Sequence, residues 1–172
     1  MPDARHANLL EPEALVELFL RHPPQGFAAA SEADLPVFGT DFDLLTTLEP
    51  AILVKIRRLP LFGLWSRLLR FPARFAGTTA TEYAPLPKGL EPGALLDGFR
   101  ERCAAGQSLL IVKDVPEVSP LLGAGDNEAA MRLARIAPDK GFIVVEGQAL
   151  AYVPIDFSST DEYLSRLSKS RR

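Results

Sequence analysis

The predicted fold depends on the C-terminal stretch of the chain, which reads GFIVVEGQALAYVPIDF over residues 141–157 and SSTDEYLSRLSKSRR over residues 158–172. Phe142–Val145 is an apolar, β-branched run, which predicts a buried strand. Ala149–Ile155 has strand character again, and Pro154 indicates that this second strand ends at a sheet edge, because proline cannot donate a ladder hydrogen bond. We therefore expect two strands here, followed by a different element.

That element is predicted to be a short helix that turns basic. Ser159 or Thr160 can cap its N-terminus, and Asp161 and Glu162 follow in the first turn, where the helix macrodipole favours negative charge. The printed sequence ends at Arg172 without a Gly or Pro stop signal. We therefore expect a helix whose sequence is interrupted.

The length and composition are those of a folded chain. With 172 residues, one domain with an added arm is expected, and an apolar fraction of 47% is ample for a core. The single cysteine, Cys103, cannot form an internal disulfide and favours a reducing compartment. There is no apolar run long enough to span a membrane and no signal-peptide pattern, so the cytoplasm is the expected location.

The charges are unevenly distributed along the chain. Residues 1–49 carry nine acids and two bases. From residue 50 to residue 81 there is no acid at all, and the six bases are Lys55, Arg57, Arg58, Arg67, Arg70 and Arg74. This asymmetry indicates either an anionic partner or packing of one segment on the other.

The order of predicted elements places the chain in the α/β (α+β) class, with a mixed, partly parallel sheet flanked by helices. Residues 1–72 are predicted to form a helical N-terminal arm packed on a core of residues 73–172. The core is predicted to run as strand 74–83, helix 93–105, strand 108–112, helix 126–137 and then the strands and helix described above.

Proline and glycine divide the predicted arm into pieces. Glu11-Pro12 starts a helix with Leu15, Leu18 and Phe19 on its apolar face. Residues 25–39 are expected to be loop or extended chain. Three helical pieces then follow, from Asp41 or Asp43 to Leu48, from Pro50 to Arg58 and from Leu61 to Phe71.

Several kinds of chemistry are excluded by the motifs. The only histidines are His6 and His22, so a Ser-His-Asp or Cys-His arrangement would have to use one of them. No Cys/His cluster predicts a zinc site, and no Gly-rich nucleotide-binding signature is present. Gly123–Asp126 could cradle a phosphate at a helix start, but we prefer a loop with Asp126 as the helix cap, because its carboxylate would repel the phosphate.

Charged residues follow two of the predicted strands, at the strand end where open α/β sheets bind ligands. Glu146 follows the strand at 142–145 and could serve as a general base that accepts a proton from an attacking amine. The alternative for Glu146 is a solvated bulge or hairpin residue. Lys113-Asp114 follows the strand at 108–112, and there a strand-end ion pair is preferred.

Two basic clusters could contact phosphates. The bases between Ile52 and Phe75 are mixed with large apolar residues, as on an anionic membrane surface, although an ordinary amphipathic helix pair has the same pattern. The terminal bases would suit a phosphate-bearing donor or a nucleic acid, or would merely complement the macrodipole; they are Arg166, Lys169, Arg171 and Arg172. No strong signal for nucleic acid is present.

Taken as a whole, residues 141–172 resemble bacterial GNAT-like N-acyltransferases of the tandem, Fem-related type, which are described as peptidoglycan biosynthesis or recognition proteins. The resemblance lies in the strand that begins Gly-Phe, the segment EGQALAYVPIDF and the helix DEYLSRLSKSRR. Residues 108–116, SLLIVKDVP, and residues 36–47, PVFGTDFDLLTT, resemble further segments of that group.

The resemblance implies that this chain is the N-terminal half of a GNAT-like enzyme, with a second acyltransferase-like half after the basic helix. It implies transfer of an acyl or aminoacyl group from a CoA or tRNA donor to an amine. The Gln/Arg-x-x-Gly-x-Gly/Ala turn that holds the acyl-CoA pyrophosphate in such enzymes is missing, so the donor site is expected outside this chain. This half alone is expected to be inactive, and the alternative is a non-catalytic binding module for an anionic surface or partner.

Overall fold

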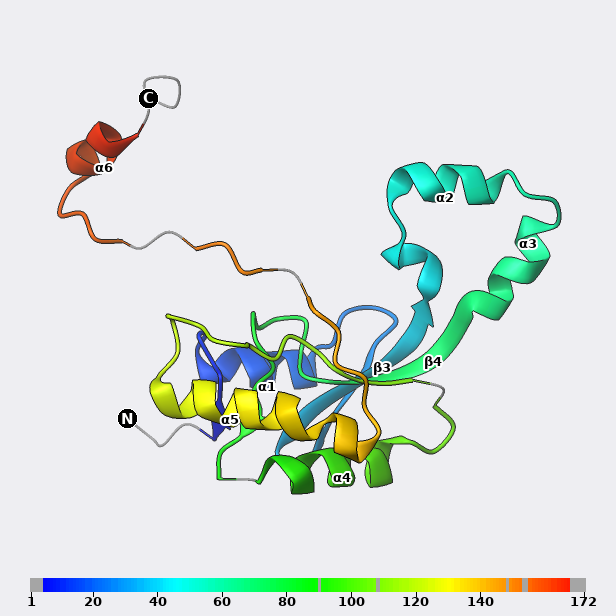
Figure 1. Cartoon of the computed structure of the whole chain (residues 1–172), viewed down its shortest axis with the longest axis horizontal. Coiled ribbons are helices and arrows are strands. Elements are labelled where there is room, and N and C mark those ends of the chain that lie inside the picture. The colour runs from blue at the N-terminus through cyan, green and yellow to red at the C-terminus, as the bar shows by residue number, and fades with distance from the viewer. Residues whose placement is uncertain (1–4, 90, 108, 148, 153–154, 168–172) are drawn as a thin grey trace.

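A four-stranded sheet with the order β2-β3-β4-β6 forms the centre of the protein (Figure 1). The computed structural model describes residues 5–89, 91–107, 109–147, 149–152 and 155–167. The strands are β2 (Ala28–Glu32), β3 (Leu35–Asp43), β4 (Arg70–Ala76) and β6 (Leu109–Val112). The β2–β3 and β3–β4 pairs are antiparallel, and the β4–β6 pair is parallel. The predicted class, a mixed and partly parallel sheet flanked by helices, is therefore confirmed.

The β2–β3 hairpin corrects the prediction of loop or extended chain at residues 25–39. Its two-residue turn, Ala33-Asp34, has positive φ at both positions, 53° and 64°, as in the type I′ turns that match strand twist. Alanine is not a typical residue for such a turn, and Pro36 and Gly39 both weaken the strand pattern of β3. The hairpin was missed for these reasons.

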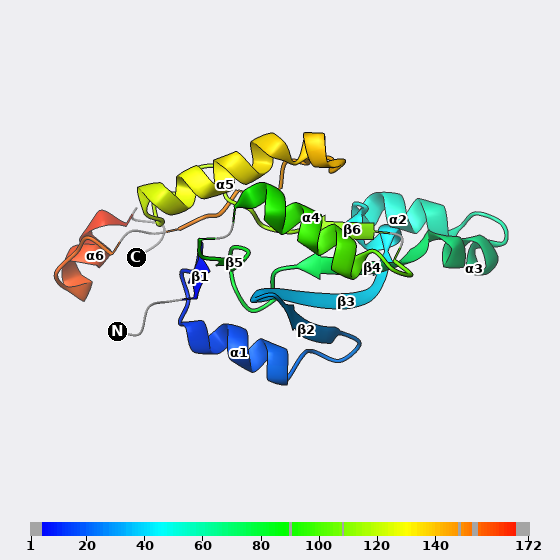
Figure 2. The same ribbon diagram turned by 90° about the horizontal axis from the view of Figure 1, so that it is seen from below.

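Helices α4 (Pro92–Cys103) and α5 (Ala124–Ile136) cover one face of the sheet (Figure 2). Leu35 and Val37 of β3 point to this face and share a core with both helices. The α4 side chains in this core are those predicted from the sequence, namely Leu95, Leu96, Phe99 and Cys103. The β4-α4-β6 unit is the parallel crossover that holds this half of the chain together.

Helix α1 (Glu13–Arg21) lies on the opposite face (Figure 2). Its buried residues are Val16 and Phe19, and the Phe19 ring meets Phe38 of β3 edge-on at 5.7 Å. The predicted stripe is therefore only partly correct, because Leu18 is exposed. The sheet covers only a narrow side of α1, and the two side chains buried on that side, Val16 and Phe19, are three residues apart.

A helical lobe connects β3 to β4 and projects from the body (Figure 1). Asp43 caps its first turn as predicted, accepting from Leu45 N at 2.9 Å. The lobe consists of η1 (Leu44–Thr47), α2 (Pro50–Arg57), α3 (Phe62–Trp65) and η2 (Ser66–Leu69). The third predicted helical piece is shorter than expected, because β4 begins at Arg70.

A small second sheet pairs β1 (His6–Ala7) with β5 (Leu86–Pro87). The strand predicted at 74–83 is displaced toward the N-terminus: β4 ends at Ala76, and Gly77 follows with φ 124°. The boundary predicted between residues 72 and 73 falls inside β4. The β2–β3 hairpin of the predicted arm therefore belongs to the same sheet as the predicted core.

The described residues of the two predicted strands, 142–145 and 149–155, form no strand. After η3 (Pro138–Lys140), Phe142 N donates to Ala137 O at 3.0 Å and Phe142 packs on the core. The chain then runs away from the body in an extended form, with Ile143 90% and Val145 80% exposed. None of the described residues in 142–155 belongs to a strand, because no ladder partner lies beside them. Pro154 lies outside the described residues.

The predicted helix after this segment is present as α6 (Thr160–Arg166). Ser159 caps it as expected, accepting from Glu162 N at 3.2 Å. No helix in the described part of the chain is both long enough and apolar enough to cross a membrane.

Candidate functional site

The strongest candidate for a ligand site lies where the parallel strands end. β4 and β6 point toward the N-termini of α4 and α5, which begin at Pro92 and Ala124. Ligands of open α/β sheets collect at this end, because backbone N–H groups of helix starts and strand-end loops meet there.

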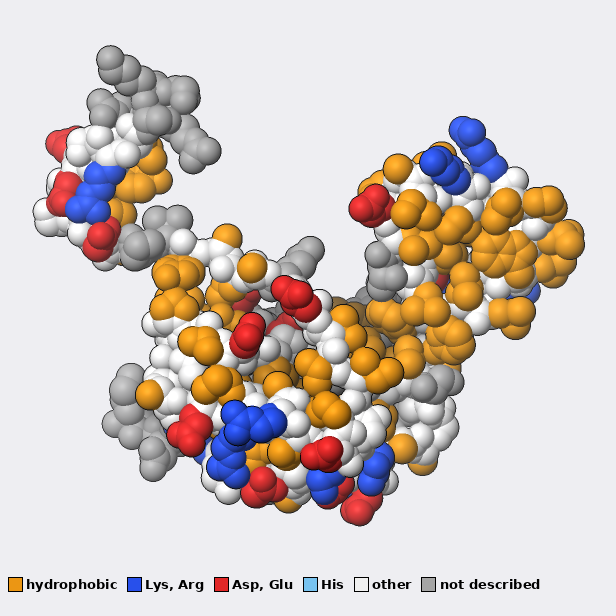
Figure 3. Space-filling model, in the orientation of Figure 1, with side chains coloured by type: hydrophobic (Ala, Val, Ile, Leu, Met, Phe, Trp, Pro, Cys, Tyr) orange, Lys and Arg blue, Asp and Glu red, His pale blue; other side chains and the backbone are white. Residues whose placement is uncertain are grey.

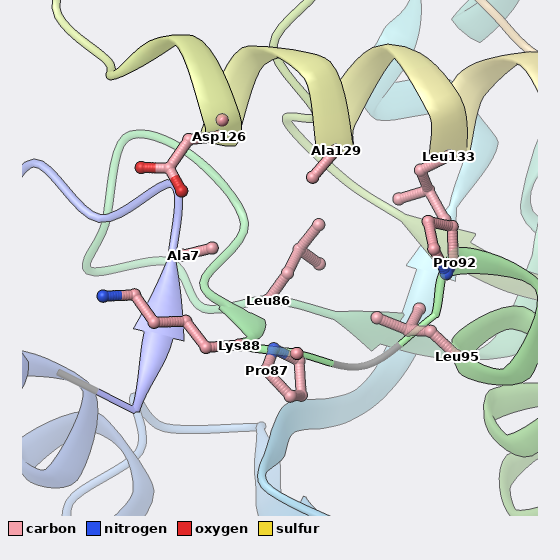
Figure 4. Close-up of a pocket in the computed structure, with 11 residues that line it drawn as sticks. Ala7, Leu86, Pro87, Lys88, Pro92, Leu95, Asp126, Ala129 and Leu133 are labelled. Atoms are coloured by element: carbon pink, nitrogen blue, oxygen red, sulfur yellow. The ribbon is translucent and has the colours of Figure 1, made fainter. Parts of the chain in front are cut away.

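A cavity of about 300 Å³ lies at this end of the structure (Figure 4). Its walls are mainly apolar and come from β1, β5, the first turn of α4 and one side of α5; they include Ala7, Leu86, Pro87, Pro92, Leu95, Ala129 and Leu133. Lys88 and Asp126 supply the charged side chains of the lining, and both reach the same side of the cavity in Figure 4. The cavity suits a mostly apolar group that carries a polar end.

Both helix starts already carry a carboxylate. Glu91 caps α4 by accepting from Gly93 N at 2.7 Å and from Ala94 N at 3.1 Å. Asp126 lies in the first turn of α5, whose N-cap is Gly123 without a side-chain cap bond. The helix cap therefore lies three residues before Asp126, the residue predicted to be the cap, but the expected repulsion of a phosphate there is retained.

An ion pair and hydrogen bonds connect polar residues at the ends of β4 and β6. Lys113 pairs with Asp114 and donates to Thr78 O at 3.0 Å, so the preferred strand-end ion pair is confirmed. Thr78 and Thr81 share a hydroxyl–hydroxyl hydrogen bond of 2.8 Å. A Cβ at Gly77 would lie 3.1 Å from Lys113 Cγ, so glycine permits both the positive φ and this close approach.

A buried histidine lies close to this region. His6 Nδ1 pairs with Glu13, and His6 Nε2 lies 2.7 Å from Asp34 O. A carbonyl can only accept, so Nε2 is the donor to Asp34 O. Neighbouring Asn8 is fully buried, and both polar atoms of its side chain lack a hydrogen-bond partner. These contacts join β1 and α1 to the β2–β3 turn.

The predicted general base, Glu146, does not line this cavity. Its side chain is exposed on the extended segment, and no described residue forms an ion pair or hydrogen bond with it. Arg166 binds Asp156 at 2.7 Å and Glu162 at 2.5 Å, as a helix-end residue does. Lys169, Arg171 and Arg172 lie outside the described residues. Of the predicted residues that the structure describes, Glu146 and Arg166 share no hydrogen bond or ion pair.

Two groups have shifted acidities. Burial raises the pKa of the Cys103 thiol, and the nearby carboxylate of Glu32 adds to this. The Ser158 backbone N–H, with the Ser158 hydroxyl and Arg166, lowers the pKa of Glu162. Neither group lines the cavity, so neither shift identifies a catalytic residue there.

Sequence reasoning missed the cavity and the His6–Glu13 pair. The apolar walls come from four separate segments, and no local pattern relates Ala7 to Leu86 or Leu133. The signal closest to the site was Gly123–Asp126, of which Gly125 and Asp126 line the cavity. Among the described residues, no group of three or more His, Cys, Asp or Glu side chains could hold a metal ion.

No family model matches the sequence, and no match was found among curated proteins or solved structures.

Proposed function

We propose that the chain is the N-terminal half of a GNAT-like N-acyltransferase that moves an acyl or aminoacyl group from a CoA or tRNA donor to an amine. It would be inactive by itself. The proposal rests first on the resemblance of residues 141–172 and 108–116. The parallel β4-α4-β6 unit, with a cavity at its ligand-binding end, is compatible with it.

The observation that carries the two-part proposal is the exposed segment after α5. Ile143, Val145 and Ile155 are 90%, 80% and 83% exposed, so this segment presents several large apolar side chains to solvent. The outer edge of β6 also has no strand beside it among the described residues. A second acyltransferase-like half that covers this segment would bury the exposed apolar side chains and pair the free edge of β6.

The donor site is assigned to that second half. A CoA pyrophosphate at the start of α4 or α5 would meet the carboxylates of Glu91 and Asp126, which disfavour it. Arg166 and the terminal bases Lys169, Arg171 and Arg172 are the proposed phosphate contacts. Arg166 would have to exchange its present partners, Asp156 and Glu162, for the donor phosphate.

In the proposed reaction the acceptor amine attacks the donor carbonyl, so that an N–C bond forms. The C–S bond of a thioester, or the C–O bond of a tRNA ester, then breaks, and the leaving group takes a proton. Glu146 is the proposed base that takes the proton from the amine. It is exposed in this half, so it can act only where the second half closes over it. The proposed compartment is the cytoplasm, in keeping with the single buried thiol.

The test is a calorimetric titration of acetyl-CoA, and separately of an aminoacyl-tRNA, into two proteins: this chain, and the full product of the gene that encodes it. Binding by the full product alone is expected. Tight binding of acetyl-CoA by this chain would overturn the assignment of the donor site to the second half. Absence of donor binding by both proteins would overturn the acyltransferase proposal. A Glu146→Gln variant of the full product should bind the donor normally and lose transfer.

A second candidate function is a non-catalytic module that binds an anionic surface. It is favoured by the bases of residues 50–74: Arg70 pairs with Asp43 at 3.2 Å, but no described acid forms an ion pair with Lys55, Arg57, Arg58 or Arg67. Packing against the acidic N-terminal segment therefore does not account for the positive charge of the lobe.

A further inference from the structure

We propose that the helical lobe between β3 and β4 docks on an anionic lipid bilayer, with its apolar side chains in the interface and its bases at the headgroups. The lobe comprises residues 44–69 (Figure 1). The inference rests on the anionic-surface function named above as the second candidate, and it is independent of acyl transfer.

The first observation is a stripe of exposed leucines. Leu61, Leu64 and Leu68 are 71%, 65% and 75% exposed. Leu64 and Leu68 are four residues apart, which puts them on one side of the α3–η2 segment, and Leu61 directly precedes this segment. Figure 3 shows the lobe largely covered by hydrophobic side chains, in contrast to the mixed surface of the body. Leucines in such a stripe are the side chains that an interfacial helix inserts among lipid chains.

The second observation is the conformation of the tip. Leu61 has φ 58°, a left-handed conformation that bulky residues rarely adopt, and its side chain is nevertheless exposed. Trp65 closes the same turn by donating from Nε1 to Pro60 O at 3.1 Å. Tryptophan with its N–H directed to a polar group is typical of the membrane interface. The lobe thus carries its own fluorescent reporter, since Trp65 is the only tryptophan.

The third observation is charge. Lys55, Arg57, Arg58 and Arg67 lie in the lobe, and the sequence has no acid from residue 50 to residue 81. Arg57 also lines a cavity of about 170 Å³, together with Ser66 and Phe62, at the base of the lobe; Asp43 and Arg70 close its other side. Apolar side chains mixed with unpaired bases are complementary to a lipid surface with anionic headgroups, whereas a nucleic acid would not accept the leucines.

The test mixes the chain with vesicles of phosphatidylcholine alone or vesicles rich in phosphatidylglycerol, and measures flotation and Trp65 emission. We expect a blue shift and flotation with the anionic vesicles, and affinity at least about tenfold lower for neutral ones. Added salt should weaken the binding. Equal binding to both vesicle types would overturn the proposal.

Two variants locate the contact. A triple change of Leu61, Leu64 and Leu68 to serine should lower vesicle affinity at least about tenfold. The matched control is Leu18→Ser, an exposed leucine on α1, which should leave binding unchanged. All of these side chains are exposed, so folding should be preserved, and circular dichroism checks it. Unchanged binding by the triple variant would overturn the assignment to the lobe.

The remaining outcomes separate this inference from the function on which it rests. Binding to heparin or single-stranded DNA without binding to vesicles would keep the anionic-surface function and overturn the lipid assignment. Binding to none of these would overturn both. Conversion of a dimer to a monomer by the leucine variant, without vesicle binding, would identify a second copy as the occupant and overturn the lipid assignment.

Discussion

Phe38 is predicted to be the residue through which the α1 layer is held on the sheet. Its buried ring stacks on Phe75 at 4.7 Å with an interplanar angle of 2° and on Phe27 at 5.1 Å, and it meets Phe19 edge-on at 5.7 Å. These partners come from β4, from the loop before β2 and from α1. A single side chain therefore joins three segments that are distant in the sequence.

Replacement of Phe38 by alanine should be severely destabilising. Truncating a buried phenylalanine costs about 3–5 kcal/mol, and each aromatic pair contributes roughly 0.5–1.5 kcal/mol beyond its buried area. With three pairs lost, we expect the upper part of that range, about 4–5 kcal/mol. For a chain of this size this corresponds to a fall in Tm of roughly 8–20 °C.

The assay is urea unfolding followed by far-ultraviolet circular dichroism, with the free energy of unfolding taken from the midpoint at constant slope. The matched control is Phe42→Ala on the same face of β3, since Phe42 is only half-buried and has one ring contact, with Phe75 at 6.0 Å. Its cost should stay below about 2 kcal/mol. Phe38→Leu, which retains most of the volume, should lose about 1–2 kcal/mol and remains measurable if the alanine variant does not fold. Equal costs for the two alanine variants would refute the reasoning.

Three smaller predictions concern local contacts. Asp43→Ala should destabilise the chain by about 1 kcal/mol, while Asp43→Asn, whose amide oxygen can still cap, should lose much less; thermal unfolding distinguishes the two, and equal losses would exclude the capping role. Cys103 should react with a disulfide reagent far more slowly in the folded chain than in urea. Because folding raises the pKa of this thiol, the stability linked to it is present below the unfolded pKa, about 8.5, and is lost as the pH rises through the folded value. If the thiol reacted as fast in the folded chain as in urea, that result would contradict its burial. Ser158→Ala should return the lowered pKa of Glu162 toward its ordinary value in a carboxyl NMR titration, only in part because the backbone N–H of residue 158 is retained. For Glu162 the dependence of stability on pH has the opposite sign to that for Cys103. The stability linked to the Glu162 carboxyl is present above the unfolded pKa, about 4.3, and is lost as the pH falls through the folded value. An unchanged titration of Glu162 in the Ser158→Ala variant would exclude the hydroxyl contact.

The candidate site was only partly predictable. Gly123–Asp126 was identified from the sequence as a turn before a helix, and a carboxylate was expected to oppose phosphate there. In the structure Gly125 and Asp126 lie in the first turn of α5 and line the cavity. The general base was placed at Glu146 on the assumption that 142–145 is a buried strand. In the structure this segment is extended and exposed, and Glu146 remains a prediction without a described neighbour.

The sequence by itself determined the features that depend on residues close together in the chain. The core face of α4 follows from periodicity, and the caps found at Asp43 and Ser159 are among the candidates that capping chemistry offered. Both depend on neighbouring residues in the sequence. The mixed class of the fold was correct for the same reason.

Only the tertiary structure decided which strand-like segments find partners. The β2–β3 hairpin forms despite Pro36 and an atypical turn, because β4 supplies hydrogen bonds along β3 and Phe38 packs under α1. The far more strand-like segment 142–145 remains unpaired. The residues of a segment set only its propensity for extended conformation. Whether a strand forms depends on a neighbouring strand that can pair with its backbone N–H and C=O groups.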